Sequence, residues 1–396
     1  IILITGGMGE KEGKKEIENR LRKVIIDSRS RPDKGPVMVG GNSLGIISGP
    51  GGYDTMFVTE SKLPKNPDLP IGKKIALISQ SGAFMITRMS KLGGILPRYA
   101  ISTGNQVDLG IADFLWHCLT DKGVKVIGCY IEGFKDGEGM RFADAVQGVS
   151  DKDIVVYKAG RSDEGRKAAS GHTAALAGDW NVADAVLKRA GCIVTHTFDE
   201  YTDLLMLCSM LSGHWAGANR LAVISGAGYE TVGMADNLRS PDYKFEFADI
   251  SEVTRERIHD ALKKYRLDGL VDIRNPIDLT PMAVDAAHVE ILKSFADDPS
   301  VDIILDACVP LSPAMKTREK GGPEGDGIED PNSFASLVIE ASRNIRKPLV
   351  LVVDSGKLYD PMVEMLMNAG IPVFRSADRA IKTLGLWAKN KFGGPR

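Results

Sequence analysis

Short apolar runs alternate with amphipathic stretches along most of the chain. In the first half, each run is followed within two residues by Gly, Gln or Glu, which is typical of buried strands that open into turns. The runs lie at Ile1–Thr5, Val37–Val39, Lys74–Ser79, Arg98–Ser102, Val124–Ile131 and Ile154–Lys158. Helical patterns lie between them, over about Glu10–Ser28, from near Ala83, and over Trp180–Arg189. Strands that alternate with helices predict an α/β fold with parallel sheets.

The same alternation returns after a break at 212–217. Strands are predicted at Leu221–Ser225, Val301–Asp306, Pro348–Val353 and Pro372–Phe374, with a helix over Glu230–Leu238. A second break, rich in proline, lies at 66–72. We therefore expect three Rossmann-like or flavodoxin-like domains, at 1–66, 71–212 and 219–396. The chain opens directly in a strand without an initiator Met, so we expect sequence upstream of Ile1.

Composition and charge exclude several classes of partner. The 396 residues carry 50 Lys and Arg against 52 Asp and Glu, a formal charge of −2, which gives no reason to expect nucleic acid or an anionic membrane. No apolar run reaches transmembrane length. We expect no metal site, reduced thiols and a cytoplasmic location, because five cysteines stand in apolar stretches without metal-ligand spacing: Cys118, Cys129, Cys192, Cys208 and Cys308.

One stretch crowds small residues around a single histidine. It reads KAGRSDEGRKAASGHTAALAGD, from Lys158 to Asp179, and we interpret it as a loop between a strand and a helix. Such a loop lets backbone N–H groups approach an anion. We therefore predict that His172 is a nucleophile that carries phosphate, with Gly171 and Thr173 as phosphate contacts. A solvated loop histidine would give the same local pattern.

Four polar loops leave the carboxyl ends of four predicted parallel strands, the edge where ligands bind in open α/β sheets. The first is Gln80-Ser81-Gly82, where Ser79 or Ser81 caps a helix whose N-terminus would attract an anion. The second carries Asn105, the third Glu132, and the fourth is the histidine loop. We predict that Gln80, Ser81, Gly82 and Asn105 bind phosphate. A capped helix in an ordinary strand–helix unit is the plain alternative.

Glu132 lies 40 residues before His172 and on the same expected edge. A carboxylate that accepts a hydrogen bond from one imidazole nitrogen leaves the other nitrogen nucleophilic and stabilises the positive charge of a phosphorylated ring. We predict that Glu132 is catalytic in this way, although a strand-end carboxylate is often merely solvated. Lys158 and Arg161 are candidate phosphate or CoA contacts, and surface charges explain them equally well. The remaining histidines, His288 included, show no partner and receive no role.

The stretch GRSDEGRKAASGHTAALAGD resembles the phosphohistidine loop of the NDP-forming acyl-CoA synthetases. This is the family of the ADP-forming acetyl-CoA synthetase α chain, which is related to the α chain of succinyl-CoA synthetase. Five further motifs resemble that family in its own order: GGNSLG at 40–45, SQSGAF at 79–84, STGNQVD at 102–108, YIEG at 130–133 and NPIDL at 275–279. The resemblance covers essentially the whole chain.

The resemblance implies an acid–thiol ligase that interconverts acyl-CoA, ADP and phosphate with a carboxylate, CoA and ATP. An acyl phosphate and a phosphohistidine at His172 would be the intermediates. Residues 1–66 would be the later part of a CoA-binding domain, and 71–212 and 219–396 two succinyl-CoA-synthetase-like domains. Two glycine-rich turns would contact CoA, through Gly6, Gly7, Gly41, Asn42 and Ser43. The family's Gly-Pro-Asn-Cys/Ser turn reads Gly-Gly-Asn-Ser at 40–43.

The resemblance also implies a partner. Nothing in the sequence resembles the ATP-grasp domain that the reaction needs, and no GxxxxGK[ST] run is present. ADP or ATP with Mg would therefore bind an ATP-grasp β chain or domain, in a hetero-oligomer or a homodimer. Two other classes stay open: a catalytically silent CoA-binding regulatory module, against which the intact His172 and Glu132 argue, and a dehydrogenase-like protein, against which the lack of a complete GxGxxG unit argues.

Overall fold

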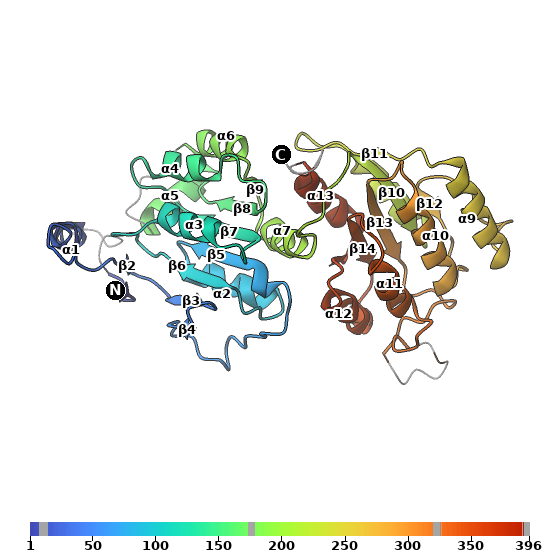
Figure 1. The fold of residues 1–396 in the computed structure, drawn as a ribbon, viewed down its shortest axis with the longest axis horizontal. Coiled ribbons are helices and arrows are strands. Elements are labelled where there is room, and N and C mark those ends of the chain that lie inside the picture. The colour runs from blue at the N-terminus through green and yellow to red at the C-terminus, as the bar shows by residue number, and fades with distance from the viewer. Residues whose placement is uncertain (8–14, 173–178, 320–324, 326, 390, 392–396) are drawn as a thin grey trace. The chain divides into compact units, whose positions relative to one another are not determined.

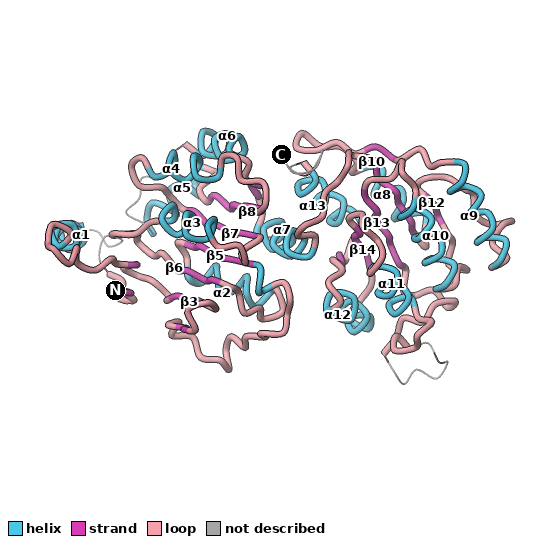
Figure 2. Tube along the Cα trace, viewed as in Figure 1, coloured by secondary structure: helices cyan, strands magenta, loops and turns pink. Residues whose placement is uncertain are grey.

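The chain folds into two compact units, Ile1–Ser212 and Gly213–Arg396. The structure is a computed structural model that describes residues 1–7, 15–172, 179–319, 325, 327–389 and 391, with the backbone alone for 169–172. Each unit carries helices around a largely parallel sheet, which confirms the expected α/β class (Figures 1 and 2). The finer division into domains at 1–66, 71–212 and 219–396 stays a prediction.

The first unit is built on a seven-stranded sheet. Its spatial order is β4 (Tyr53–Asp54), β3 (Ile46–Ser48), β6 (Tyr99–Ser102), β5 (Ile75–Ser79), β7 (Val126–Ile131), β8 (Asp153–Lys158) and β9 (Ile193–Thr195). The strands from β6 to β9 run parallel, whereas β3 is antiparallel to both of its neighbours. The inner strands are almost entirely buried, because helices cover both faces of the sheet. The four strands that precede the expected site loops thus end at one edge.

Helices flank this sheet on both sides (Figure 1). One face carries α2 (Gly82–Lys91) and α7 (Phe198–Met210), and the other carries α3 (Ile111–Thr120), α4 (Glu138–Val146) and α6 (Trp180–Ala190). A short 3₁₀ turn, η1 (Gly72–Lys74), precedes β5. The buried Arg88 of α2 donates hydrogen bonds to α7, to Phe198 O at 3.1 Å and to Thr202 Oγ1 at 3.2 Å. The two helices are therefore fixed to each other by a buried cation as well as by apolar packing.

The first 66 residues are joined closely to the loop after β6. A two-stranded parallel sheet pairs β1 (Ile2–Leu3) with β2 (Val39–Gly40), and α1 (Lys15–Ser28) lies between them in sequence. The N–H groups of Asn105 and Val107 donate to the carbonyls of Gly41 and Gly40 at 2.9 and 2.8 Å. This pairing holds the turn at 40–43 against the loop that carries Asn105. Residues 8–14, where the first helix was expected to begin, lie outside the described part of the chain.

The prediction of a loop around the histidine is wrong for residues 163–172, which form α5 (Asp163–His172). The hydroxyl of Ser162 accepts the N–H of Gly165 at 3.0 Å, and two acidic residues occupy the first turn. Both features stabilise a helix N-terminus, and the following Arg, Lys and Ala residues are good helix formers. Cap and propensity therefore outweigh the small residues as a local signal.

The second unit is built on a six-stranded parallel sheet. Its path is β11 (Glu246–Phe247), β10 (Arg220–Ser225), β13 (Ile303–Cys308), β14 (Leu349–Val353) and β15 (Val373–Phe374), and β12 (Ile277–Asp278) also pairs with β10. One face carries α8 (Gly228–Asp236) and α13 (Ala377–Ala388). The other carries α9 (Glu252–Lys264), α10 (Asp285–Asp297), α11 (Phe334–Ser342) and α12 (Asp360–Asn368), and the 3₁₀ turn η2 (Lys357–Tyr359) precedes α12.

The asparagine of the NPIDL motif completes one edge of β10. β11 pairs with the start of this strand and β12 with its end. Between them, the side chain of Asn275 accepts the N–H of Val223 at 2.9 Å and donates to the carbonyls of Leu221 and Ala248 at 2.8 and 3.0 Å. The amide thus replaces ladder hydrogen bonds that a backbone would otherwise make.

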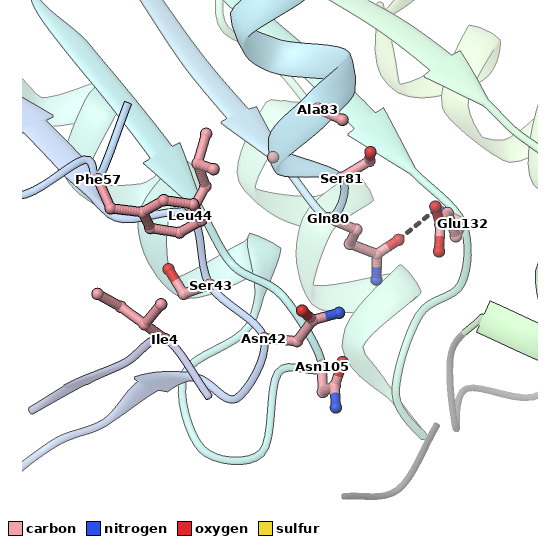
Figure 3. A pocket seen from close by; sticks show the side chains of 11 residues that line it. Ile4, Asn42, Ser43, Leu44, Phe57, Gln80, Ser81, Ala83, Asn105 and Glu132 are labelled. Carbon is pink, nitrogen blue, oxygen red and sulfur yellow. Dashed lines mark hydrogen bonds between the residues drawn. The ribbon is translucent and has the colours of Figure 1, made fainter. Parts of the chain in front are cut away.

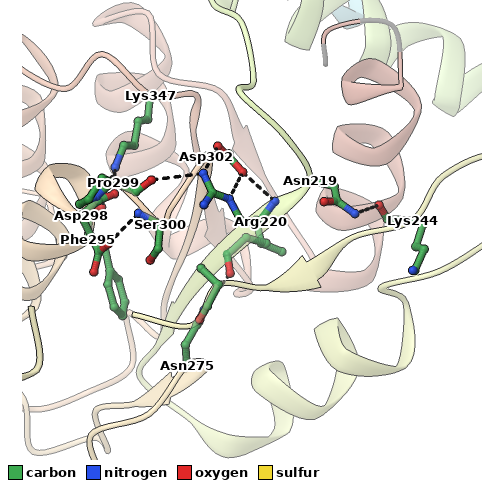
Figure 4. A network of polar contacts seen from close by, with 12 residues as sticks. Asn219, Arg220, Lys244, Asn275, Phe295, Asp298, Pro299, Ser300, Asp302 and Lys347 are labelled. Atoms are coloured by element: carbon green, nitrogen blue, oxygen red, sulfur yellow. Dashed lines mark hydrogen bonds and ion pairs between the residues drawn. The ribbon is translucent and has the colours of Figure 1, made fainter. Parts of the chain in front are cut away.

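Two pairs of polar side chains stand at β10 and β13 of this unit, one at the strand starts and one in the interior. At the amino ends, the Arg220 guanidinium binds the Asp302 carboxylate through two N–H groups, at 2.7 and 2.9 Å (Figure 4). In the interior, His288 Nε2 lies 2.6 Å from Asp306 Oδ1, and both side chains are buried. The expectation that His288 has no partner is therefore wrong, because Asp306 comes from a strand 18 residues further along the chain.

All five cysteines are free and buried, as their apolar surroundings in the sequence predicted. None of the helices in the described ranges is long and apolar enough to cross a membrane.

Candidate active site at the edge of the first sheet

A pocket of about 250 Å³ lies at the carboxyl edge of the first unit's sheet (Figure 3). The loops after β5, β6 and β7 meet there with the turn at 42–44. Its lining residues are Ile4, Asn42, Ser43, Leu44, Phe57, Gln80, Ser81, Gly82, Ala83, Asn105 and Glu132. The fold thus brings together residues predicted separately as phosphate contacts, CoA contacts and the catalytic carboxylate.

Gln80 holds the backbone on which Glu132 stands. Its Oε1 accepts the N–H groups of Glu132 and of Gly133, the latter at 3.0 Å, and its Nε2 donates to Gly133 O at 2.7 Å. The Gln80 side chain is only 6% exposed. Both polar atoms of the amide are therefore engaged within the protein. Gln80 orients the loop after β7, in addition to any contact with a ligand.

The N-terminus of α2 faces the same pocket. Ser81 is the N-cap and accepts the N–H of Phe84 at 3.2 Å, while the hydroxyl of Ser79 donates to Ser81 O at 2.6 Å. A Cβ atom on Gly82 would lie 2.4 Å from Cβ of Leu44, so the close approach of that side chain requires glycine. Free N–H groups and the positive end of the helix dipole make this a suitable site for an anion.

Glu132 sits half-buried between a hydroxyl and an ammonium group. Burial, followed by the charge and the hydrogen bond of Glu132, raises the pKa of the Tyr130 phenol well above its ordinary value. On the other side, Lys158 Nζ donates to Glu132 O at 2.8 Å. The Glu132 carboxylate thus stands at the pocket wall beside a phenol, and Lys158 holds the main chain that carries it.

Asn105 reaches the pocket through a tight turn. Gly104 has φ +56°, and a Cβ atom there would lie 2.0 Å from Gly41 O. Glycine therefore allows the loop after β6 to lie directly on the turn at 40–43. The next residue, Gln106, is buried and accepts the N–H of Ile111 at 2.9 Å, a structural role that its sequence context did not reveal.

Some predicted site residues are not brought into this pocket. Gly41 is buried behind it, and its carbonyl accepts the N–H of Asn105. Gly6 and Gly7 lie beyond Ile4 and do not line the pocket. Of His172 and Gly171 the structure describes the backbone at the end of α5, which follows β8 at this edge, and Thr173 lies outside the described residues. The roles of all of these residues stay predictions.

Two features of the site escaped the sequence. Lys158 was weighed as a surface charge, and that interpretation is wrong because the side chain is only 4% exposed. Its place at the end of a buried apolar run was the available signal. One wall of the pocket is apolar, formed by Ile4, Leu44 and Phe57, and no local pattern marks these residues because they come from three separate turns.

Comparisons with known proteins identify a matching domain family and relatives that span the chain. Residues 72–208 match the model of the succinyl-CoA ligase like flavodoxin domain. The α subunit of ADP-forming acetate–CoA ligase II from Pyrococcus furiosus is 29% identical over 405 residues, covering 100% of this chain and 79% of the relative. The α subunit of ligase I from the same organism is also 29% identical, over 98% of this chain and 77% of the relative. The chain belongs to the NDP-forming acyl-CoA synthetase family.

A solved member of this family shares the fold. The acetyl-coenzyme A synthetase 1 of Ca. Korarchaeum cryptofilum, determined in complex with phosphate and ADP, superposes with a TM-score of 0.77 at 25% identity. The match covers 98% of this chain and 76% of the solved one. Six of the residues that line the pocket, from Gln80 to Glu132, lie within the region that matches the ligase domain model, and the other five belong to the first 66 residues.

Proposed function

We propose that the chain is the α chain of an ADP-forming acyl-CoA ligase, the activity for which its Pyrococcus furiosus relatives are named. One observation carries the proposal beyond family membership. The predicted catalytic carboxylate, Glu132, and the predicted phosphate contacts at 80–82 and 105 line one pocket, on the edge from which α5 leads to His172.

The reaction proceeds through two phosphorylated intermediates, an acyl phosphate and a phosphohistidine. A phosphate oxygen attacks the thioester carbonyl of acyl-CoA, the C–S bond breaks, and CoA leaves with the proton that phosphate gives up. An imidazole nitrogen of His172 then attacks phosphorus, the bond between phosphorus and the acyl oxygen breaks, and the carboxylate leaves. Finally the P–N bond breaks as the phosphoryl group passes to ADP, which yields ATP and the free histidine.

The chain's own residues supply binding, charge and orientation. The N–H groups at the start of α2, with Ser81 and Gly82, bind the phosphoryl oxygens. Asn105 and Asn42 add donors from the facing turns (Figure 3). Glu132 accepts the N–H of one imidazole nitrogen of His172, which keeps the other nitrogen free to attack and stabilises the imidazolium of the intermediate.

CoA binds across the turn at 41–43, and the nucleotide binds elsewhere. The described residues contain no group of three or more His, Cys, Asp or Glu placed to hold a metal ion. We assign Mg, with ADP or ATP, to an ATP-grasp β chain or domain, in keeping with the naming of the relatives as α subunits. The metal supplies charge neutralisation of the nucleotide phosphates, and this chain delivers the phosphoryl group.

Labelling of the intermediate tests the proposal. The protein incubated with acetyl-CoA and ³²P-labelled phosphate, or with its partner and γ-labelled ATP, should take up acid-labile, alkali-stable label on a single histidine. His172→Ala should take up none. Label on a serine, or label that persists in His172→Ala, would refute a phosphohistidine at this position. The alternative of a silent CoA-binding module predicts CoA binding without label.

A further inference from the structure

We propose that Lys158 is a positioning residue that fixes Glu132 relative to the segment leading to His172. The inference rests on the proposed function, since it concerns a step of that reaction. Lys158 is the last residue of β8, and its ammonium group donates to two carbonyls, Glu132 O and Ala159 O, both at 2.8 Å. It thereby ties the turn after β7 to the first residue of the chain that continues into α5.

The local geometry makes this link rigid. The Lys158 side chain is 4% exposed, and its own carbonyl accepts the indole N–H of the buried Trp180 at 2.9 Å. The turn it holds is fixed from the other side by Gln80, which binds the N–H groups of Glu132 and Gly133. The Glu132 main chain is thus held on both its N–H and its C=O sides, which leaves its carboxylate with few orientations.

The charge of Lys158 contributes as well as its hydrogen bonds. Burial lowers the pKa of Lys158 to about 8, and the Glu132 carboxylate opposes that shift. A buried cation beneath the pocket balances a carboxylate and an incoming phosphoryl group that would otherwise repel each other. Among the residues that the structure describes, the charged group that acts on it is Glu132, and the Tyr130 phenol lies next to Glu132.

The same strand offers a matched control. Lys152, just before β8, is 6% exposed, and its ammonium group also donates to two carbonyls, Asp121 O and Val124 O, both at 2.9 Å. It lies at the amino end of β8, whereas the pocket lies at the carboxyl end. Lys152 and Lys158 therefore share burial and hydrogen bonding to two carbonyls and differ in their place relative to the site, although Lys152 also lies 3.4 Å from the Asp151 carboxylate.

The experiment compares Lys158→Met with Lys152→Met in the full chain. Met keeps the length of the stem and removes the charge and its donors, so both variants should lose stability to a similar extent. The rate of His172 labelling from acetyl-CoA and ³²P-phosphate, at saturating concentrations of both, should fall by about 10- to 100-fold in Lys158→Met, the cost of a displaced catalytic group. It should stay within about 2-fold of wild type in Lys152→Met, while CoA binding is retained in both.

Lys158→Arg adds a readout that a merely structural lysine would not move. In wild type the labelling rate should decline above about pH 8, as the ammonium group loses its proton. The guanidinium stays charged over that range, so Lys158→Arg should label faster than Lys158→Met and lose the decline above pH 8. If Lys158→Met fails to fold, the pH profiles of wild type and Lys158→Arg decide the question.

Each other outcome overturns a stated part. Equal labelling rates in the two Met variants, or identical pH profiles of wild type and Lys158→Arg, would make Lys158 a structural residue like Lys152. An unlabelled wild type would overturn the proposed function, and this inference with it. That failure is distinguishable, because it appears before any lysine is changed.

Discussion

The two sheets share a strand–turn–helix element at the carboxyl end of a central strand, and the two elements differ in what they surround. In each, the last residue of a central strand is a serine whose hydroxyl lies against the carbonyl two residues on: Ser79 to Ser81 O at 2.6 Å, and Ser225 to Ala227 O at 2.9 Å. Each turn leads into a helix, α2 or α8, through a glycine. In the first unit this element lines a pocket, whereas in the second it lies against the buried carboxylate of Glu230.

The position of the acid decides between the two. Glu132 follows the neighbouring strand β7 and stands half-buried at the pocket wall beside the Tyr130 phenol, and its main chain is held by Gln80 and Lys158. Glu230 lies on α8 itself, is 1% exposed, and accepts a hydrogen bond from Ser225 at 2.5 Å. The shared strand–turn–helix element therefore does not by itself indicate a catalytic site. The distinguishing feature is a carboxylate that lines a pocket.

The largest effect that we expect from this comparison is kinetic. Glu132→Gln is nearly isosteric and keeps the main-chain contacts, so the melting temperature should change by no more than about 2 °C. His172 labelling should nevertheless slow by about 10²-fold or more, because the imidazole loses its charged acceptor. Single-turnover labelling with acetyl-CoA and ³²P-phosphate measures this rate.

Glu230→Gln is the control for that measurement. It makes the same chemical change at the buried carboxylate of the second unit's strand–turn–helix element, and labelling should stay within about 2-fold of wild type. Wild-type kinetics in Glu132→Gln would instead mean that Glu132 is an ordinary strand-end carboxylate. A similar loss in both variants would mean that the pocket alone does not account for the chemistry.

The sequence predicted the pocket's members well because they share a simple rule. Residues that follow parallel strands gather at one edge, and Gln80, Asn105 and Glu132 obey it. The sequence did not predict the buried lysine that holds the turn after β7. Whether a lysine at the end of an apolar run points outwards or folds back on two carbonyls depends on the neighbouring turn, so Lys158 was indistinguishable from a surface charge.

The sequence predicted the positions of the long strands well and the segment around His172 wrongly. The long apolar runs became strands within one or two residues of their expected bounds, because buried parallel strands need continuous apolar sequence. The segment around His172 failed, since its small residues hid a capped helix start at Ser162. Asn275 shows a third case: its motif was recognised, but its role in completing the edge of β10 follows only from two strands that pair with one.

A smaller effect is expected from the amide that holds Glu132. Gln80→Leu keeps the side-chain volume but leaves the N–H groups of Glu132 and Gly133 without their acceptor, at a cost of about 1–3 kcal/mol in unfolding free energy. We expect labelling to fall roughly 10-fold as the carboxylate becomes mobile. Denaturant unfolding and labelling of the same preparation separate the two effects, and lost stability with an unchanged labelling rate would limit Gln80 to a structural role.

The smallest effect concerns the closed edge of the second unit and depends on pH. Burial raises the pKa of Glu230 to about 7, helped by the nearby Asp354 and Asp306 carboxylates and opposed by the Ser225 hydrogen bond and by His288. Between the ordinary value of 4.5 and about 7 the folded state thus holds a proton that the unfolded state has lost. The free energy of unfolding therefore falls as pH rises through this window.

Glu230→Gln isolates that contribution, because Gln is neutral at every pH and nearly the same shape. We expect the melting temperature of wild type to drop by a few degrees more than that of Glu230→Gln between pH 5 and pH 8, with the two proteins close together at pH 5. Hydrogen exchange of β10 and α8 assigns the transition to the second unit. Parallel curves for the two proteins would mean that Glu230 is ionised in the folded state, and that the second edge is open to water as the first one is.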